Sequence, residues 1–281
     1  MYDILARPVY DSLLDVNIQN PLNLEHPLAQ GLIGFWLPLP SLSGGLKLYD
    51  LSLYSRHGTL TNMDPATAWT TIQNTPAIYL DGVDESIYVG KTGINWSQSN
   101  PFTIFVVAAA AGDPPTGYGT LVNAHSVAAA ETIAYLIASS STGRLHLWKH
   151  SEASLPTTWK DGNLHSFSVS HPAGANNGQD LLYYDGRPLA VSSGGHYGWT
   201  RTNDDMRIGS AVTTAHEWYG WIAAVMIYNR VLTASEHQLC WDLVRSGFPA
   251  LLNRRPRFWP VVSEQALPKM VPWHLFQQVS A

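Results

Sequence analysis

The chain has little cysteine and no long apolar run. Cys240 is its one cysteine, which excludes an intrachain disulfide and a zinc site built from several thiolates. No stretch of about 18 apolar residues is present, so we predict no membrane-spanning helix and no membrane partner. Residues 1–8 lack a basic region followed by an apolar one, so we expect no signal peptide and synthesis in a cytoplasm.

Charge is also scarce. Charged residues make up 13% of the chain, the net charge is −5 and the pI is near 6.1. No basic stripe runs along the sequence, which argues against nucleic acid as a partner. Hydrophobic residues make up 45%, a normal fraction for an ordered globular protein.

Several catalytic patterns are missing as well. No glutamate is followed two positions later by an aspartate, so the strand spacing that aims paired glycosidase carboxylates into one cleft is absent. No Gly-x-Ser-x-Gly elbow occurs. His146 and His150 have helical metal spacing but lie in a strand-like segment, where four residues span about 13 Å. We therefore expect them to be exposed strand residues, and we predict no catalytic residue, no metal site and no enzyme.

Short β-strand patterns fill the middle of the chain. Residues 164–171 alternate between apolar and polar side chains, which predicts one buried and one solvated face. Asp185-Gly186 lies between two such segments and predicts a tight hairpin, because a type I′ turn needs positive φ at both central residues. The strands that we expect cover residues 76–80, 86–90, 102–109, 119–124, 132–138, 144–149, 164–171, 180–184, 188–191, 206–209 and 219–228.

One helix is marked at Thr233–Ser246. Thr233 and Glu236 have the spacing of a capping box, and Gly247 follows as a stop signal. The residues expected on its apolar face are Leu239, Cys240, Leu243 and Val244. Cys240 is therefore expected to be a core residue rather than a reactive thiol.

The two flanks differ from the middle. Residues 1–29 and 249–281 are interrupted by prolines and carry apolar side chains without sustained periodicity, so we predict extended arms on either side of a domain at 30–248. Such side chains cannot form a core alone, so we expect them to dock on a partner. The docking residues that we predict are Val9, Leu13, Leu14, Arg254, Arg255, Arg257, Phe258, Trp259, Trp273 and Phe276.

The order of motifs resembles that of laminin-G-like domains of the concanavalin-A-like superfamily. The resemblance runs from Gly31-Leu-Ile-Gly-Phe-Trp through Leu80-Asp-Gly-Val-Asp-Glu to Tyr219-Gly-Trp-Ile and the helix that follows. It implies an all-β, concanavalin-A-like (laminin-G-like) jelly-roll sandwich with one C-terminal helix and extended N- and C-terminal arms. Relatives often bind calcium, for which Asp50, Asp81 and Asp84 are candidates. The loop Ser52–Arg56 departs from the family pattern, so we favour turn-forming roles for these aspartates and expect no cofactor.

The whole layout also resembles virion proteins of tailed phages. His26-Pro-Leu before the opening strand and the Arg-rich, aromatic tail from Arg254 carry this resemblance. It implies a non-enzymatic virion structural protein, such as a capsid decoration protein or an accessory head or tail component. The partner would be the major capsid protein or another virion protein, and we expect a homo-oligomer.

The alternative is a carbohydrate-binding, lectin-like adhesion module that binds a cell-surface glycan. A loop predicted at 192–203 carries His196, Tyr197, Trp199 and Arg201 among glycines. Exposed aromatic rings can stack on sugars, whereas the competing interpretation is that these rings cover the edge of the sandwich. A glycosidase is a third hypothesis, but it needs a carboxylate pair that the sequence lacks.

Overall fold

The structure is a computed structural model of the whole chain. It describes residues 16, 17, 19, 21–39, 42, 44–115, 117–125, 136–139, 142–147, 150–176, 178–193, 200–202, 205–211, 216–246, 248 and 250–253. The helical elements are η1 (Pro27–Ala29), α2 (Pro65–Ala68), η3 (Thr157–Lys160) and α3 (Ala234–Ser246).

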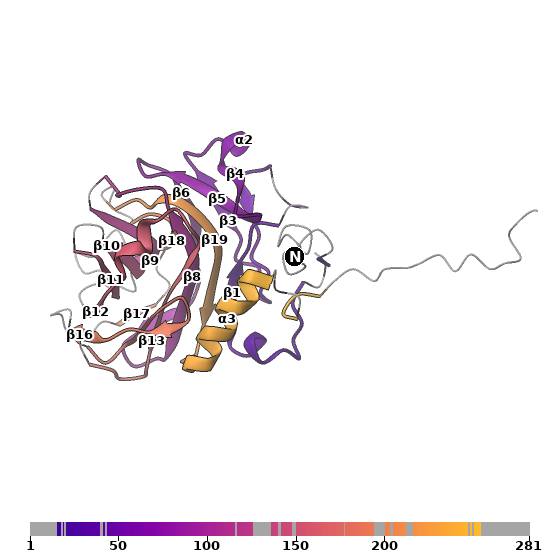
Figure 1. Cartoon of the computed structure of the whole chain (residues 1–281). Coiled ribbons are helices and arrows are strands. Elements are labelled where there is room, and N and C mark those ends of the chain that lie inside the picture. The colour runs from indigo at the N-terminus through magenta and orange to yellow at the C-terminus, as the bar shows by residue number, and fades with distance from the viewer. Residues whose placement is uncertain are drawn as a thin grey trace, which may run out of the picture.

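Two antiparallel sheets face each other and form a jelly-roll sandwich (Figure 1). The first has the order β15-β14-β13-β8-β19-β5-β4, and β1 also pairs with β19. Its strands are β1 (Leu32–Trp36), β4 (Trp69–Ile72), β5 (Thr75–Asp81), β8 (Phe102–Ala110), β13 (His165–His171), β14 (Leu181–Tyr184), β15 (Arg187–Pro188) and β19 (Tyr219–Tyr228). The predicted all-β fold with one C-terminal helix is confirmed.

The second sheet has the order β16-β12-β11-β10-β9-β18-β6-β3-β2. Its strands are β2 (Lys47–Leu48), β3 (Gly58–Thr61), β6 (Ser86–Lys91), β9 (Tyr118–His125), β10 (Leu136–Ser139), β11 (Arg144–Leu147), β12 (Ser151–Ser154), β16 (Val191–Ser193) and β18 (Asp205–Ile208). A separate ribbon joins β7 (Asn95–Ser97) to β17 (Thr200–Thr202). The shortest of these strands, such as β2, are not predicted, because two or three residues carry no periodic signal.

The two sheets enclose a core that we call the inter-sheet core. Inward-facing side chains of neighbouring strands fill it, as period-2 alternation dictates. Val106 on β8 lies opposite Phe167 on β13, and both are fully buried. Trp36, Trp159 and Trp218 are also fully buried and belong to the same cluster.

A second apolar cluster, the outer core, lies on the other face of the first sheet. It joins side chains of β1, β8 and β19 to α3 and to the chain just before and after the domain. Figure 1 shows α3 lying across this face of the sheet, beside β1 and β19. Val16, Leu22, Leu28 and Leu252 are buried here. The described ends of the two predicted arms therefore pack onto the domain.

Helix α3 begins as predicted. The Thr233 Oγ1 accepts a hydrogen bond from the Glu236 amide, and the Glu236 carboxylate accepts one from the Thr233 amide at 2.8 Å. The helix buries Cys240, Leu243 and Val244, and also His237. Leu239, expected on the apolar face, is instead 37% exposed, because it lies at the edge of the face that packs on the sheet.

Two predictions of solvent exposure are wrong. Ser166, Ser168 and Ser170, on the face of β13 predicted to be solvated, are completely buried beneath α3 and its neighbours. His146 and His150 are also buried rather than exposed. Strand alternation identifies two faces but does not reveal that a distant helix or loop covers the polar one.

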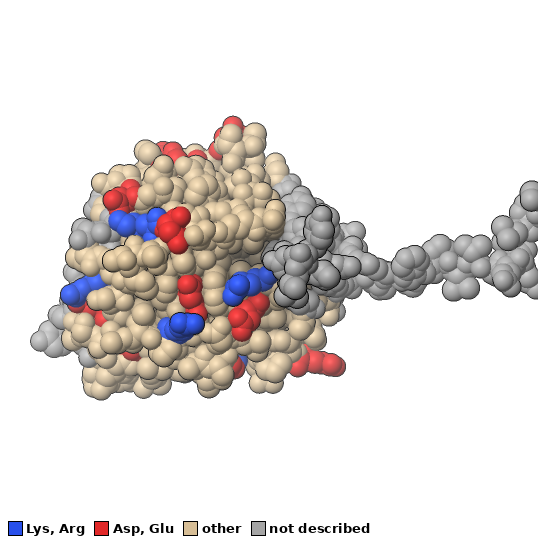
Figure 2. Space-filling view, viewed as in Figure 1, with Lys and Arg blue, Asp and Glu red and all other residues tan. Residues whose placement is uncertain are grey.

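The predicted hairpin is confirmed. Asp185 and Gly186 connect β14 to β15 with φ values of 49° and 71°. None of the described helices is long and apolar enough to cross a membrane. Figure 2 shows basic and acidic side chains in small, mixed groups separated by neutral surface.

Candidate functional site

The predicted glycan-binding loop is described only at its end. His196, Tyr197 and Trp199 lie outside the described residues. Arg201 lies in β17, where its backbone is opposite Trp96 of β7, whose ring is fully buried. That loop therefore stays a prediction.

The predicted docking residues of both arms also lie outside the described part of the chain. They are Val9, Leu13, Leu14, Arg254, Arg255, Arg257, Phe258, Trp259, Trp273 and Phe276.

The described ends of the two arms lie side by side. The Asn17 amide donates to the Asn253 carbonyl, and the Asn23 amide donates to the Leu251 carbonyl, both at 2.8 Å. The segments that precede residue 16 and follow residue 253 thus start from adjacent positions.

Asp50, a candidate calcium ligand, has a structural role. Its Oδ1 accepts from the amides of Phe35 and Ser52, each at 2.8 Å. Its Oδ2 accepts from the Ser52 hydroxyl and the Arg56 amide. Four protein donors thus occupy the oxygens that a cation would need, and they tie the loop after β2 to β1.

The other two candidates, Asp81 and Asp84, flank the turn between β5 and β6. Asp81 Oδ1 accepts from the Val83 amide, and Asp84 Oδ2 accepts from the Asn62 side chain. Burial, aided by these two carboxylates, raises the pKa of Glu85 and that of Glu217. The hydrogen bond of Asp81 is that of a turn-forming residue, as the sequence favours, whereas Asp84 accepts from a side chain 22 residues away.

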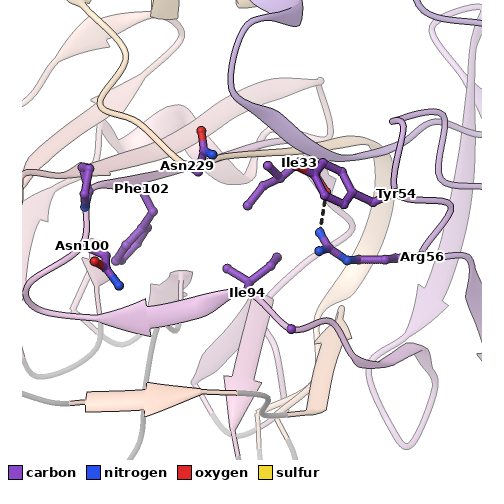
Figure 3. Close-up of a pocket in the computed structure, with 9 residues that line it drawn as sticks. Ile33, Tyr54, Arg56, Ile94, Asn100, Phe102 and Asn229 are labelled. Atoms are coloured by element: carbon purple, nitrogen blue, oxygen red, sulfur yellow. Dashed lines mark hydrogen bonds between the residues drawn. The ribbon is translucent and has the colours of Figure 1, made fainter.

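A pocket of about 340 Å³ lies at one end of the sandwich (Figure 3). Tyr54 and Arg56 lie on one side, and Asn100 and Phe102 lie on the other. Ile33, Gly93, Ile94, Pro101 and Asn229 complete the described lining. These residues come from β1, β8 and four connecting segments, including the one that follows β19.

The pocket side formed by Tyr54 and Arg56 is held in place. The guanidinium of Arg56 lies 4.3 Å from the centre of the Tyr54 ring, and its Nη1 donates to the Ile33 carbonyl at 2.7 Å. Burial lowers the pKa of Arg56, whereas Asp50 opposes this shift. Tyr54 itself is 52% exposed, although Arg56 covers one face of its ring.

The lining chemistry suits recognition rather than bond cleavage. Apolar and aromatic side chains form the walls, and the amides of Asn100 and Asn229 offer both donors and acceptors. Among the described lining residues there is no carboxylate, histidine, serine or cysteine. The described lining thus lacks a carboxylate pair and a histidine, and the Tyr54 hydroxyl is its one common acid–base or nucleophilic group.

Sequence reasoning missed this pocket because five separate stretches between Ile33 and Asn229 build it. One signal was present: the loop Ser52–Arg56 departs from the family pattern, and it is this loop that places Tyr54 and Arg56 at the pocket. A departure that weakens a calcium site can therefore mark a different kind of site.

Two further hollows flank Trp241 and Arg245 on α3. The larger, about 610 Å³, is lined by Tyr184, Asp185 and Arg187 among others, and the smaller, about 210 Å³, by Gln73 and Leu164 among others. The aromatic ring that lines both of them belongs to Trp241, which is partly buried, whereas Tyr54 is 52% exposed.

Comparisons with known proteins show the fold alone. No family model and no curated sequence matches the chain. A Trypanosoma rangeli sialidase in complex with sialic acid is similar in structure, with a TM-score of 0.56 and 15% identity over 84% of this chain. That match covers 37% of the sialidase, so this chain spans little more than a third of that protein's length.

Two other solved structures share the sandwich. Domain 4 of AbnA, a GH43 extracellular arabinanase from Geobacillus stearothermophilus in complex with arabinotriose, has a TM-score of 0.50 and 17% identity; the match covers 74% of this chain and 96% of that domain. The binding domain of botulinum neurotoxin serotype G has a TM-score of 0.50 and 12% identity, over 75% of this chain and 51% of that one. The structural similarity of these domains to the chain supports a common β-sandwich architecture.

Proposed function

We propose that the chain is a non-enzymatic carbohydrate-binding module whose ligand occupies the pocket between Tyr54 and Phe102. The observation that carries this proposal is the exposed Tyr54 ring, fixed beneath Arg56 and facing a pocket lined with amides. A sugar ring stacks on an aromatic face, and its hydroxyls pair with amide groups. The arabinanase domain and the sialidase that share the fold were solved with arabinotriose and sialic acid. Saccharides are therefore the class of ligand to test first.

The test compares two tyrosines, each with an arginine guanidinium lying over its ring. Tyr54 lies in the pocket, whereas Tyr88 lies outside it on β6, 38% exposed and 5.5 Å from the Arg207 guanidinium. The full chain is screened on a glycan array, and the best ligand is titrated by calorimetry. We expect Tyr54→Ala to weaken binding at least about tenfold and Tyr88→Ala to leave it within about twofold. Equal effects of the two substitutions, or no glycan bound by the full chain, would refute the proposal.

The absence of catalysis is part of the proposal. It rests on the lack of a carboxylate and of a histidine among the described lining residues. Incubation of the protein with its bound oligosaccharide, followed by mass spectrometry, is expected to return the ligand intact. Time-dependent cleavage that Tyr54→Ala abolishes would instead indicate a glycosidase.

The second candidate function is that of a virion structural protein that docks through its arms, as a capsid decoration protein or an accessory head or tail component. The observation that favours it is the pairing of Asn17 with Asn253, which starts both flanking segments at one place on the domain. Two segments that start together can engage one site on a capsid protein. An adhesin displayed on a particle would combine both functions.

Deleting residues 1–15 and 254–281 tests this second candidate. These limits spare the described residues of the outer core, so the domain keeps its packing. The trimmed and full chains are expressed with the structural proteins of the particle, and their incorporation is compared. We expect the trimmed chain to be lost from particles; normal incorporation would exclude docking through the arms. Light scattering of the full chain tests the expected homo-oligomer.

A further inference from the structure

Two histidines and an aspartate from separate segments meet in the interior, away from the saccharide pocket. His150 follows β11, His171 ends β13 and Asp180 precedes β14. All three are at most 1% exposed, and one potential ligand atom from each lies within 4.8 Å of the others. Imidazole nitrogens and a carboxylate are the ligand types that zinc and similar metals prefer in proteins.

The hydrogen bonds of His171 fix how its ring is protonated. Its Nε2 lies 3.0 Å from the carbonyl oxygen of Gln98, which can only accept, so Nε2 carries a proton. Its Nδ1 lies 2.6 Å from Asp180 Oδ1, which also only accepts when ionised. Two lone pairs cannot face each other at this distance, so either a proton, on His171 or on Asp180, or a bound metal ion lies between the two atoms.

The surroundings resemble the outer shell of a metal site. A histidine ligand usually donates its other nitrogen to a carbonyl or carboxylate, as His171 does to Gln98. Asp180 Oδ2 faces His150 Nδ1 and also accepts from the Ser151 hydroxyl. Ser151 Oγ in turn accepts from the Gly178 amide at 3.0 Å. His171 and Asp180 thus each have a partner outside the three potential ligands that orients them.

The backbone around the cluster is also locked. The Gly174 amide donates to the Gln98 carbonyl at 2.6 Å, and the Gln98 side chain donates to the Ala175 carbonyl at 2.7 Å. The Gly178 amide donates to the His150 carbonyl at 3.1 Å. The connection between β13 and β14 is thereby tied to the turns after β7 and β11, which is the setting of a closed structural metal site.

We propose that His150 Nδ1, His171 Nδ1 and Asp180 bind a divalent transition-metal ion of the zinc type, with the Ser151 hydroxyl or a water in the fourth position. Bonds of about 2.0–2.1 Å in a tetrahedron separate ligand atoms by roughly 3.3 Å. The 2.6 Å between His171 Nδ1 and Asp180 Oδ1 would therefore open by well under an ångström. The ion replaces the protons between these atoms, which pass to solvent. Its role is to fasten the β13–β14 connection, independently of any saccharide.

The experiment uses the full chain, stripped with a chelator and titrated with ZnCl2 by calorimetry and with CoCl2 by visible absorption. We expect one ion per chain with a submicromolar Kd, the strong visible bands of tetrahedral cobalt and a higher Tm with zinc. His171→Gln and His150→Gln each remove one ligand and are expected to weaken binding at least about 100-fold.

His146→Gln is the matched control. It makes the same change at a buried histidine of β11, outside the cluster, and is expected to leave affinity within about twofold. Where a ligand variant fails to fold, Ser151→Ala keeps all three ligands and is expected to weaken binding about 10-fold or more. The proposal is overturned if the full chain binds no zinc or cobalt stoichiometrically, or if His150→Gln and His171→Gln bind like wild type. The cluster would then be a buried histidine–carboxylate pair that shares a proton.

Discussion

The inter-sheet core and the outer core share the first sheet but are built differently. The inter-sheet core takes its apolar side chains from the facing sides of the two sheets. The outer core joins residues 16–51 to residues 223–252 and lies beside a buried polar network. There Ser168 and Ser170 bind the two ring nitrogens of His237, at 2.9 and 3.0 Å. The first core requires only that the two sheets face each other, whereas the second also requires α3 and the segments that flank the domain to pack on the other face of the first sheet.

The largest expected loss of stability comes from replacing one buried phenylalanine by alanine in each core. Phe167 fills the inter-sheet core and Phe248 the outer core, where its ring lies 5.3 Å from that of Phe35. Both rings are at most 1% exposed, so Phe167→Ala and Phe248→Ala should each lower the free energy of unfolding by about 3–5 kcal/mol. Urea denaturation measures the loss.

Hydrogen exchange then separates the two cores. Phe248→Ala is expected to reduce protection of the Asn17 and Asn23 amides, which pair with residues 253 and 251, far more than Phe167→Ala does. Identical exchange patterns in the two variants would mean that the cores unfold as one unit.

The next largest effect is on the pH dependence of stability, through His237 beside the outer core. Burial lowers the pKa of His237 from 6.5 to about 3. The unfolded chain therefore binds one more proton than the folded chain between these values. The contribution of neutral His237 to the free energy of unfolding is fully present above pH 6.5 and is lost as the pH falls toward 3.

His237→Gln should make the slope of unfolding free energy against pH shallower by up to about 1.4 kcal/mol per pH unit in that window. Denaturant melts from pH 8 to 4 provide the slopes. Parallel curves for wild type and variant would show that the pKa of His237 is the same in the folded and the unfolded chain.

A smaller effect concerns the start of α3, which closes the outer core. The Glu236 carboxylate accepts from Thr233 and pairs with Arg230, and the Arg230 hydrogen bond lowers its pKa from 4.5 to about 2. Glu236→Gln is expected to cost about 1–2 kcal/mol at pH 7.

Because the folded-state pKa of Glu236 is depressed, the stability difference between wild type and Glu236→Gln is fully present above pH 4.5. It disappears as the pH falls toward 2. Thermal melts at pH 7 and pH 3 check it. A cost that is the same at both pH values would assign the loss to packing rather than to charge.

The smallest effect is the expected inertness of Cys240. Burial in the outer core raises the pKa of its thiol to about 12. A thiol reagent at pH 8 should therefore label the folded protein only as fast as the outer core opens. Phe248→Ala should speed labelling much more than Phe167→Ala; equal acceleration would mean that Cys240 reacts only after global unfolding.

Features that depend on neighbouring residues can be predicted from the sequence. The Asp185-Gly186 hairpin and the Thr233–Glu236 cap each need only a few consecutive residues, and both are confirmed. The burial of Ser168 cannot be read in this way, because it follows from the position of His237, 69 residues later. The pocket at Tyr54 and the cluster at His171 are likewise made by loops whose meeting depends on the complete sandwich.

The pairing of Asn17 with Asn253 also makes the domain a good subject for circular permutation. Because the two backbones lie within a hydrogen bond of each other, a short linker would join them without distorting either core. New termini would fall in the exposed loop of residues 161–163. The same closeness would allow the whole domain to be inserted into a surface loop of another protein, because both connections to the host would leave the domain side by side.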